Sequence, residues 1–196
     1  MPPEYPIKVL VGVAVKGPAG SIPAHRPNTA TPLGGDRRLT LATLTLILLI
    51  IGGDVSEQRK VMIAQFANEI DNQPDEMRDL LTALAWSESD FDHTAESHAG
   101  ACGILQLMPR WSGASCATLK ADIPYAVDAA VEELTKWERN CGREWMVASW
   151  NQGYHCCLGG WYYRKRKGSR EFNCTERAKA FQVKVWRRVR YIQRRR

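Results

Sequence analysis

Apolar residues recur at helical spacing along much of the chain, and this periodicity constrains the fold more than any other feature. Met77, Leu81 and Leu84 mark one such stripe, because positions three or four apart share one face of a helix. The next position on that face is Glu88, so a carboxylate lies in register with the apolar side. A carboxylate there is either half-buried in a cleft or badly placed, and a glycine-containing turn over residues 100–106 follows it. We therefore take Glu88 as the starting point for a candidate active site.

Further helices are predicted on both sides of this stripe. Residues 124–140 and 175–193 carry apolar positions in helical phase, and Ser56 is a plausible N-cap for a helix over residues 56–70. Pro74 followed by two acidic residues is typical of a helix start. No convincing period-two alternation marks a large sheet, so we expect a mainly α fold.

A leader rich in proline and glycine precedes the part that we expect to fold. Residues 1–36 hold seven of the ten prolines and five of the fifteen glycines. This composition predicts a flexible segment without helical periodicity. We therefore expect residues 54–196 to form the folded domain, separated from the leader by an apolar segment.

That apolar segment, residues 37–53, begins with two arginines and continues into fifteen uncharged residues, 39–53. As a helix these extend only ~22 Å, short of the ~30 Å hydrocarbon core of a bilayer. We expect a signal peptide or a weak signal anchor, the alternative being a buried core helix. Because 38 residues ahead of the apolar run are too many for an ordinary signal peptide, we also expect the true start downstream of Met1.

All six cysteines come after residue 100. An even number confined to the folded part is typical of disulfides in an exported protein, although spacing does not determine the pairing. No CxxC pair is present, and the cluster His155, Cys156 and Cys157 is a weak candidate for a metal site. We therefore expect neither a metal nor another cofactor.

The C-terminal part of the chain is strongly basic, whereas the rest is acidic. Residues 161–196 carry 14 of the 27 Lys and Arg residues and 2 of the 21 Asp and Glu residues, a net charge of +12. This asymmetry predicts an anionic wall polymer or lipid surface as a partner, unless these residues form only a solvated helix face. Because base-stacking motifs are missing, we expect no specific nucleic-acid partner.

The position of Glu88 determines the chemistry that it can perform. On an apolar face it would be partly desolvated, which raises the pKa of its carboxyl and keeps a proton available near neutral pH. A general acid at a glycosidic oxygen requires this. A hydrolase with two carboxylates needs a second acid across the sugar, but Asp90 and Asp92 are too near in sequence to face Glu88. The residues favour a single catalytic carboxylate and leave distant acids such as Glu133 open.

Three short motifs follow one another: Glu88-Ser89, AGACGILQLMP over residues 99–109, and ASWNQG over residues 148–153. Together they resemble the soluble lytic transglycosylase (SLT) domain, whose motifs read Glu-Ser, Gly-Leu-Met-Gln, and Ala-Tyr-Asn followed by Gly. The resemblance covers about residues 73–154. It implies a lysozyme-like, mainly helical fold and cleavage of the β-1,4 bond between MurNAc and GlcNAc in peptidoglycan without water, which leaves a 1,6-anhydromuramoyl end.

The resemblance also assigns roles to the matching residues. Glu88 would protonate the leaving oxygen and then take the proton from the muramoyl C6 hydroxyl as that oxygen closes on C1. The remaining matches would contact or position the sugar: Ser89, Gly103, Gln106, Trp150, Asn151 and Tyr154. Trp150 stands where the family has Tyr, so it keeps an aromatic wall but loses a hydroxyl that could bind Glu88. A disulfide from Cys102 to Cys116 or to a later cysteine would brace the glycine turn.

Two other functions fit the same residues. A goose-type lysozyme-like hydrolase would share the fold and use water, whereas a non-enzymatic cationic binder would need only the basic C-terminal segment. We expect the enzyme to be exported to the periplasm or the cell exterior, with a membrane anchor near residues 39–53 if this segment is not cleaved. A phage, a secretion machine or a conjugation machine is the expected context, and the sequence predicts no oligomeric state.

Overall fold

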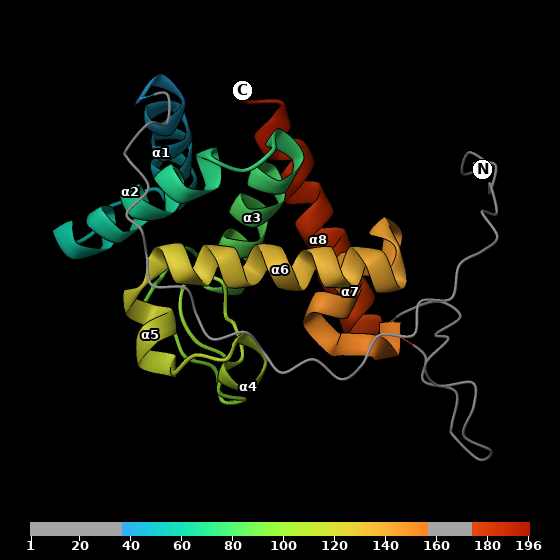
Figure 1. The fold of residues 1–196 in the computed structure, drawn as a ribbon. Coiled ribbons are helices and arrows are strands. Elements are labelled where there is room, and N and C mark those ends of the chain that lie inside the picture. The colour runs from blue at the N-terminus through green and yellow to red at the C-terminus, as the bar shows by residue number, and fades with distance from the viewer. Residues whose placement is uncertain (1–36, 157–173) are drawn as a thin grey trace, which may run out of the picture. The chain divides into compact units, whose positions relative to one another are not determined.

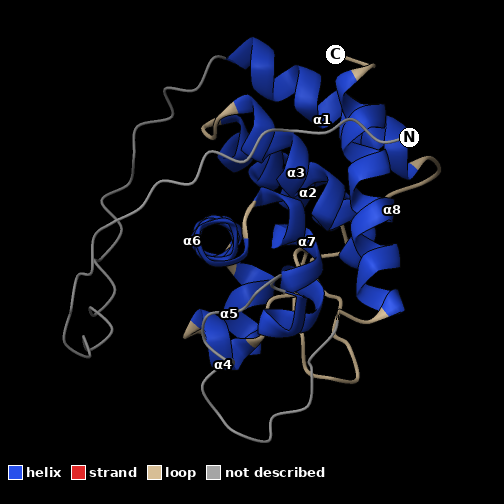
Figure 2. Cartoon of the chain, turned by 90° about the vertical axis from the view of Figure 1, so that its right-hand side faces the viewer, coloured by secondary structure: helices blue, strands red, loops and turns tan. Residues whose placement is uncertain are grey.

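The computed structural model describes residues 37–156 and 174–196, and this part of the chain is built from helices and loops without a β-strand (Figures 1 and 2). The prediction of a mainly α fold is therefore confirmed. The elements are α1 (Arg37–Ile51), α2 (Glu57–Asp71), α3 (Asp75–Glu88), α4 (Pro109–Ser112), α5 (Cys116–Ala121), α6 (Ile123–Cys141), α7 (Arg143–Gln152), the 3-10 turn η1 (Gly153–Cys156) and α8 (Glu176–Gln193). The predicted leader, residues 1–36, lies outside the described residues.

Short polar side chains begin several of these helices. Ser56 Oγ accepts a hydrogen bond from Arg59 N at 3.3 Å, so the predicted N-cap of α2 is confirmed. Asp122 caps α6 and Thr175 caps α8 in the same way. These caps satisfy backbone donors that the first turn of a helix leaves without a partner.

The helix α3 lies at the centre of the core. Leu81 and Leu84 are fully buried, and Met77 is partly buried against the same cluster. Helix α3 packs against α2, α6 and α8, and α7 packs between α6 and α8 (Figure 1). Because the stripe faces inward over its whole length, Glu88 comes at its end, where the core meets a cavity.

The uncharged segment forms α1, which packs along α2 (Figure 1). Its inner face joins the core through Leu46 and Ile47, and Thr43 Oγ1 donates a hydrogen bond to Asp71 Oδ1 at 2.7 Å. None of the described helices, α1 included, has the length and apolar character needed to cross a bilayer. The prediction of a signal peptide or anchor over residues 37–53 stays a prediction.

Two disulfides join neighbouring elements. The Cys102–Cys116 bridge links the glycine turn to the start of α5. The Cys156–Cys174 bridge links η1 to the segment just before α8. Cys141 is disulfide-bonded as well. The prediction of disulfide bonds is confirmed, and the Cys102–Cys116 and Cys156–Cys174 bridges brace segments that contain little regular structure.

Candidate active site

Glu88 is the last residue of α3 and opens onto a cavity of about 550 Å³. The cavity is bounded by the loop that follows α3, by α4, by one face of α6, by α7 and by the first turn of α8. Its lining residues are Glu88, Ser97, His98, Ala99, Ala101, Gln106, Leu107, Met108, Trp111, Ser112, Ala129, Glu133, Trp150, Asn151 and Arg177. A second hollow shares Trp111, Glu133 and Trp150 with this cavity and is also lined by Trp137 and Gly153. The two hollows therefore adjoin, and Glu88 lines the first of them.

The Glu88 carboxyl is half-buried and accepts a hydrogen bond from α7. Trp150 Nε1 donates to Glu88 Oε1 at 2.9 Å. Burial raises the pKa of this carboxyl from its ordinary 4.5 to about 7, although the Trp150 hydrogen bond and the positive charge of Lys184 both pull the pKa down. Glu88 can therefore hold or release a proton near neutral pH.

The indole N–H of Trp150 makes the contact to Glu88 for which a Tyr hydroxyl is missing at this position. The sequence comparison of Tyr with Trp predicts an aromatic wall without a hydrogen bond to Glu88, but the indole N–H reaches the carboxylate. An indole N–H only donates, whereas a phenol hydroxyl can also accept. Oε1 must therefore remain unprotonated while this bond is present, and a proton on Glu88 belongs on Oε2.

The backbone after Glu88 turns sharply out of the helix. Asp90 and Phe91 both have positive φ, 56° and 63°, a conformation that non-glycine residues adopt rarely and at a cost in free energy. The Phe91 ring is fully buried against Phe66, and the Arg59 guanidinium donates to the Asp90 carbonyl. These contacts hold the turn in its strained conformation and fix the direction in which the chain leaves α3.

Ser89 ties this turn to the glycine turn instead of facing the cavity. Its hydroxyl donates to the carbonyl of Ile104 at 2.7 Å and lies 3.3 Å from the carbonyl of Ala85. The side chain is not among the lining residues. The structure thus gives Ser89 a supporting position behind Glu88, which is consistent with the second of the two implied roles, a contact to the sugar or the orientation of Glu88.

Gly103 also lies behind the cavity. It is buried, with φ of 77°, and a Cβ atom at this position would come within 2.3 Å of the Leu119 carbonyl oxygen in α5. The close approach that the structure shows at Gly103 is made to α5, because the loop packs directly on the α5 backbone, and the predicted approach of a ligand stays a prediction. Gly103 is absent from the cavity lining.

Gln106 does line the cavity, and its amide locks the turn that precedes it. Nε2 donates to the carbonyl of Ala95 at 3.1 Å and to that of Gly103 at 3.0 Å. The residue has a φ of 50°, the third non-glycine residue with positive φ in the described part of the chain. Both hydrogens of the Gln106 amide are donated within the protein, so this side chain can offer a ligand only its Oε1 atom as an acceptor.

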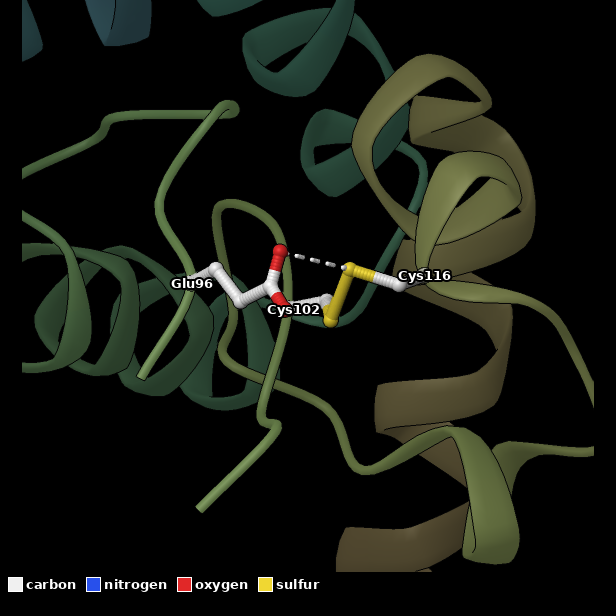
Figure 3. A group of neighbouring side chains, drawn as sticks. All are labelled: Glu96, Cys102 and Cys116. Carbon is white, nitrogen blue, oxygen red and sulfur yellow. Dashed lines mark hydrogen bonds between the residues drawn. A yellow bond between two sulfur atoms is a disulfide. The ribbon is translucent and has the colours of Figure 1, made fainter. Parts of the chain in front are cut away.

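The Cys102–Cys116 bridge lies beside the Glu96 carboxylate (Figure 3). Glu96 Oε2 is 3.5 Å from Cys116 Sγ and accepts a hydrogen bond from Lys120 Nζ at 2.7 Å. Metal ions bind cysteine as the thiolate, and a disulfide offers none. This cluster braces the loop and, in its oxidised form, does not have the donors of a metal site.

The structure brings four of the predicted site residues together at the cavity: Glu88, Gln106, Trp150 and Asn151. Asn151 is exposed on α7 next to Trp150. Tyr154 belongs to the turn η1, but its side chain lies outside the described residues. Gln106 comes from the glycine turn and Asn151 from α7, so two separate segments bring these side chains to the cavity that Glu88 lines.

The cavity also contains residues outside the predicted set of site residues, among them Glu133, which the sequence left open as a second acid. Glu133 on α6 is 21% exposed and pairs with Lys136 at 3.3 Å, and Arg177 reaches the cavity from α8. His98 and the exposed ring of Trp111 complete this set. Helical spacing indicates that Glu133 flanks the buried face of α6. No local sequence pattern indicates that Arg177 lies near Glu88, because the two residues are far apart in the chain.

A comparison with protein-family models supports the resemblance found in the sequence. The family model described as "Transglycosylase SLT domain" matches residues 65–173, a little over half of the chain. The matched range contains α3 with Glu88, the glycine turn and all of α7. No curated protein and no solved structure matches the chain.

Proposed function

The chain belongs to the transglycosylase SLT domain family, and from this premise we propose that it is a peptidoglycan lytic transglycosylase. At the family level the match supports an enzyme that cleaves glycosidic bonds of peptidoglycan outside the cytoplasm. Disulfides are consistent with this location, because they persist in oxidising compartments. The finer proposal is that the products carry a 1,6-anhydromuramoyl end.

The observation that carries this proposal is the Glu88 carboxyl, with a pKa of about 7, in the wall of the cavity. A general acid works best when its pKa lies near the working pH. In the first step, the proton on Oε2 would pass to the glycosidic oxygen as the bond to the muramoyl C1 breaks. The hydrogen bond from Trp150 to Oε1 would stabilise the carboxylate that forms.

In the second step, the same carboxylate would accept the proton of the muramoyl C6 hydroxyl while its oxygen bonds to C1. Atoms balance without water, because the proton lost in the first step returns to Glu88 in the second. The nucleophile is part of the substrate, so the protein has to position it and does not have to activate a water molecule. We assign the positioning to Gln106 Oε1 and to the exposed amide of Asn151, which line the cavity from two sides.

A goose-type hydrolase is the second candidate, and Glu133 is the observation that favours it. This carboxylate lines the same cavity and could activate a water molecule. Its ion pair with Lys136 argues for a structural role, since both charges are then already compensated. The substitution Glu133→Gln distinguishes the candidates: a transglycosylase keeps most of its lytic activity, whereas a hydrolase that uses Glu133 as its base loses it.

The mass of the released muropeptides tests the proposal directly. Purified peptidoglycan digested with the full chain should give fragments one water lighter than those with a reducing end. Fragments with ordinary reducing ends would exclude the transglycosylase. A purely cationic binder would release no fragments at all, and Glu88→Gln would leave its binding unchanged.

A further inference from the structure

One face of α1 carries apolar side chains that no part of the described chain covers. Leu41 is 65% exposed and Leu49 is 68% exposed, with Ala42 and Thr45 exposed between them. The positions 41, 45 and 49 form one stripe along the helix. No charged residue occurs between positions 39 and 53, so no charged side chain accounts for the exposure of Leu41 and Leu49 to water.

The C-terminal end of α8 and helix α1 both lie at the top of Figure 1, and Arg195 shares a groove with α1. Arg195 lines a shallow groove of about 520 Å³ together with residues of α1: Leu41, Ala42, Thr45, Leu46 and Leu49. The Arg195 guanidinium stacks over the ring of Tyr191, 4.6 Å from its centre, and this ring is itself exposed. We call these exposed residues, Leu41, Leu49, Tyr191 and Arg195, the α1–α8 surface.

Uncompensated positive charge continues from this surface along α8. Arg187, Arg190 and Arg194 are exposed and share one face of the helix. Within the ranges that the structure describes, no carboxylate lies within ion-pair distance of these three residues or of Arg195, whereas Arg196 pairs with Asp79 at 2.9 Å. The end of α8 therefore offers several guanidinium groups to an anion outside the protein.

We propose that the α1–α8 surface docks the protein on a bilayer that contains anionic phospholipids. Apolar side chains at one edge and arginines beside them are the features of helices that lie in the interfacial plane, where leucines enter the acyl region and guanidinium groups contact phosphates. An anionic wall polymer would satisfy the arginines but would leave Leu41 and Leu49 in water. The helix α1 is too short to span the bilayer, so it would lie along its surface.

Docking in this way would leave the cavity at Glu88 free. Arg177 in the first turn of α8 lines the cavity, and Arg195 just past its last turn lines the groove beside α1. The eighteen residues of α8 extend about 27 Å at 1.5 Å per residue. The cavity and the α1–α8 surface thus lie at opposite ends of α8, so docking at one end would leave the other accessible. This inference does not depend on the reaction that Glu88 performs.

Vesicle flotation with the full chain tests the proposal. The protein should float with vesicles of phosphatidylcholine and phosphatidylglycerol and remain at the bottom with phosphatidylcholine alone. Leu41→Asn combined with Leu49→Asn should weaken binding by at least about tenfold, from the loss of two buried leucines. Arg195→Gln should weaken it by about fivefold, the effect of one charge near an anionic surface.

Matched substitutions elsewhere provide the controls. Val61→Asn replaces an apolar residue that is 55% exposed on α2, and Arg139→Gln removes an exposed charge on α6. Both should bind vesicles like the wild type, and all variants should keep wall lysis in solution, which shows that they fold. Equal flotation of the leucine double variant and the wild type would overturn the proposal. So would binding to an isolated anionic wall polymer without binding to vesicles, or a mature protein that begins after residue 53.

Discussion

Replacing Glu88 with Gln should separate the chemistry of this residue from its effect on stability. Gln has nearly the same shape, and its carbonyl oxygen can still accept the hydrogen bond of Trp150 Nε1. It carries no proton that it can transfer, so wall lysis should fall by at least about a hundredfold. The same substitution should make the folded protein more stable at neutral and alkaline pH.

The stability gain follows from the raised pKa of Glu88. In the unfolded chain this carboxyl has its ordinary pKa of 4.5, and in the folded protein its pKa is about 7. Below pH 4.5 both states hold the proton, so the wild type and Glu88→Gln should be alike. As the pH rises from 4.5 to 7, the unfolded chain releases the proton and the folded protein keeps it, which lowers the free energy of unfolding of the wild type. At about 1.4 kcal/mol for each pH unit, the loss above pH 7 is roughly 3 kcal/mol.

Urea unfolding followed by tryptophan fluorescence at pH 4 and at pH 8, with the disulfides oxidised, measures this difference. Glu88→Gln should exceed the wild type by roughly 3 kcal/mol at pH 8 and by little at pH 4. Glu133→Gln is the matched control in the same cavity, and it should lower stability by at most about 1 kcal/mol through loss of an ion pair to Lys136. An equal stability of Glu88→Gln and the wild type at pH 8 would refute the desolvation of Glu88.

Three further substitutions test the surroundings of Glu88. Trp150→Phe removes the N–H that lowers the pKa of Glu88, so the alkaline limb of the pH profile of lysis should move to higher pH and the maximal rate should fall about tenfold; an unshifted limb would contradict this. Gly103→Ala places a Cβ against the Leu119 carbonyl and should destabilise the fold by about 2–4 kcal/mol in urea unfolding, and a change below about 1 kcal/mol would show that the loop yields easily. Cys102→Ser with Cys116→Ser opens a loop of 14 residues and should lower the free energy of unfolding by about 3 kcal/mol, whereas an unchanged thermal midpoint would mean that the bridge adds nothing.

The sequence predicted the position of Glu88 because the signal is local. Helical periodicity connects Met77, Leu81 and Leu84 with the next residue on the same face, and one helix determines that relationship. The structure then places Glu88 between the core and the cavity, with a raised pKa. The catalytic role of Glu88 remains a prediction that the activity measurements test.

The contacts that the sequence could not predict join distant segments. Gly103 needs its small size because α5 passes beside it, and no pattern within the loop indicates that neighbour. The missing Tyr hydroxyl put a hydrogen bond from position 150 in doubt, yet the indole N–H of Trp150 reaches Glu88 across 62 residues of sequence. Arg177 enters the cavity only because α8 packs against α7.

The apolar segment, residues 37–53, shows a different limit of prediction from sequence. Its uncharged run is equally typical of a signal peptide, an anchor and a core helix. The structure buries one face of α1 on α2 and leaves Leu41 and Leu49 exposed on the other. A hydropathy average cannot separate two such faces, because it sums the residues that point inward with those that point outward.

The central claim is that the muramoyl C6 hydroxyl, and not water, completes the reaction that Glu88 begins. Digestion of purified peptidoglycan by the full chain in oxygen-18-labelled water, followed by mass spectrometry of the fragments, tests it most directly. If the C6 hydroxyl is the nucleophile, the fragments should be one water lighter than fragments with a reducing end and should carry no label from the solvent. Fragments with one oxygen-18 at the muramoyl C1 would contradict it and would identify the enzyme as a hydrolase.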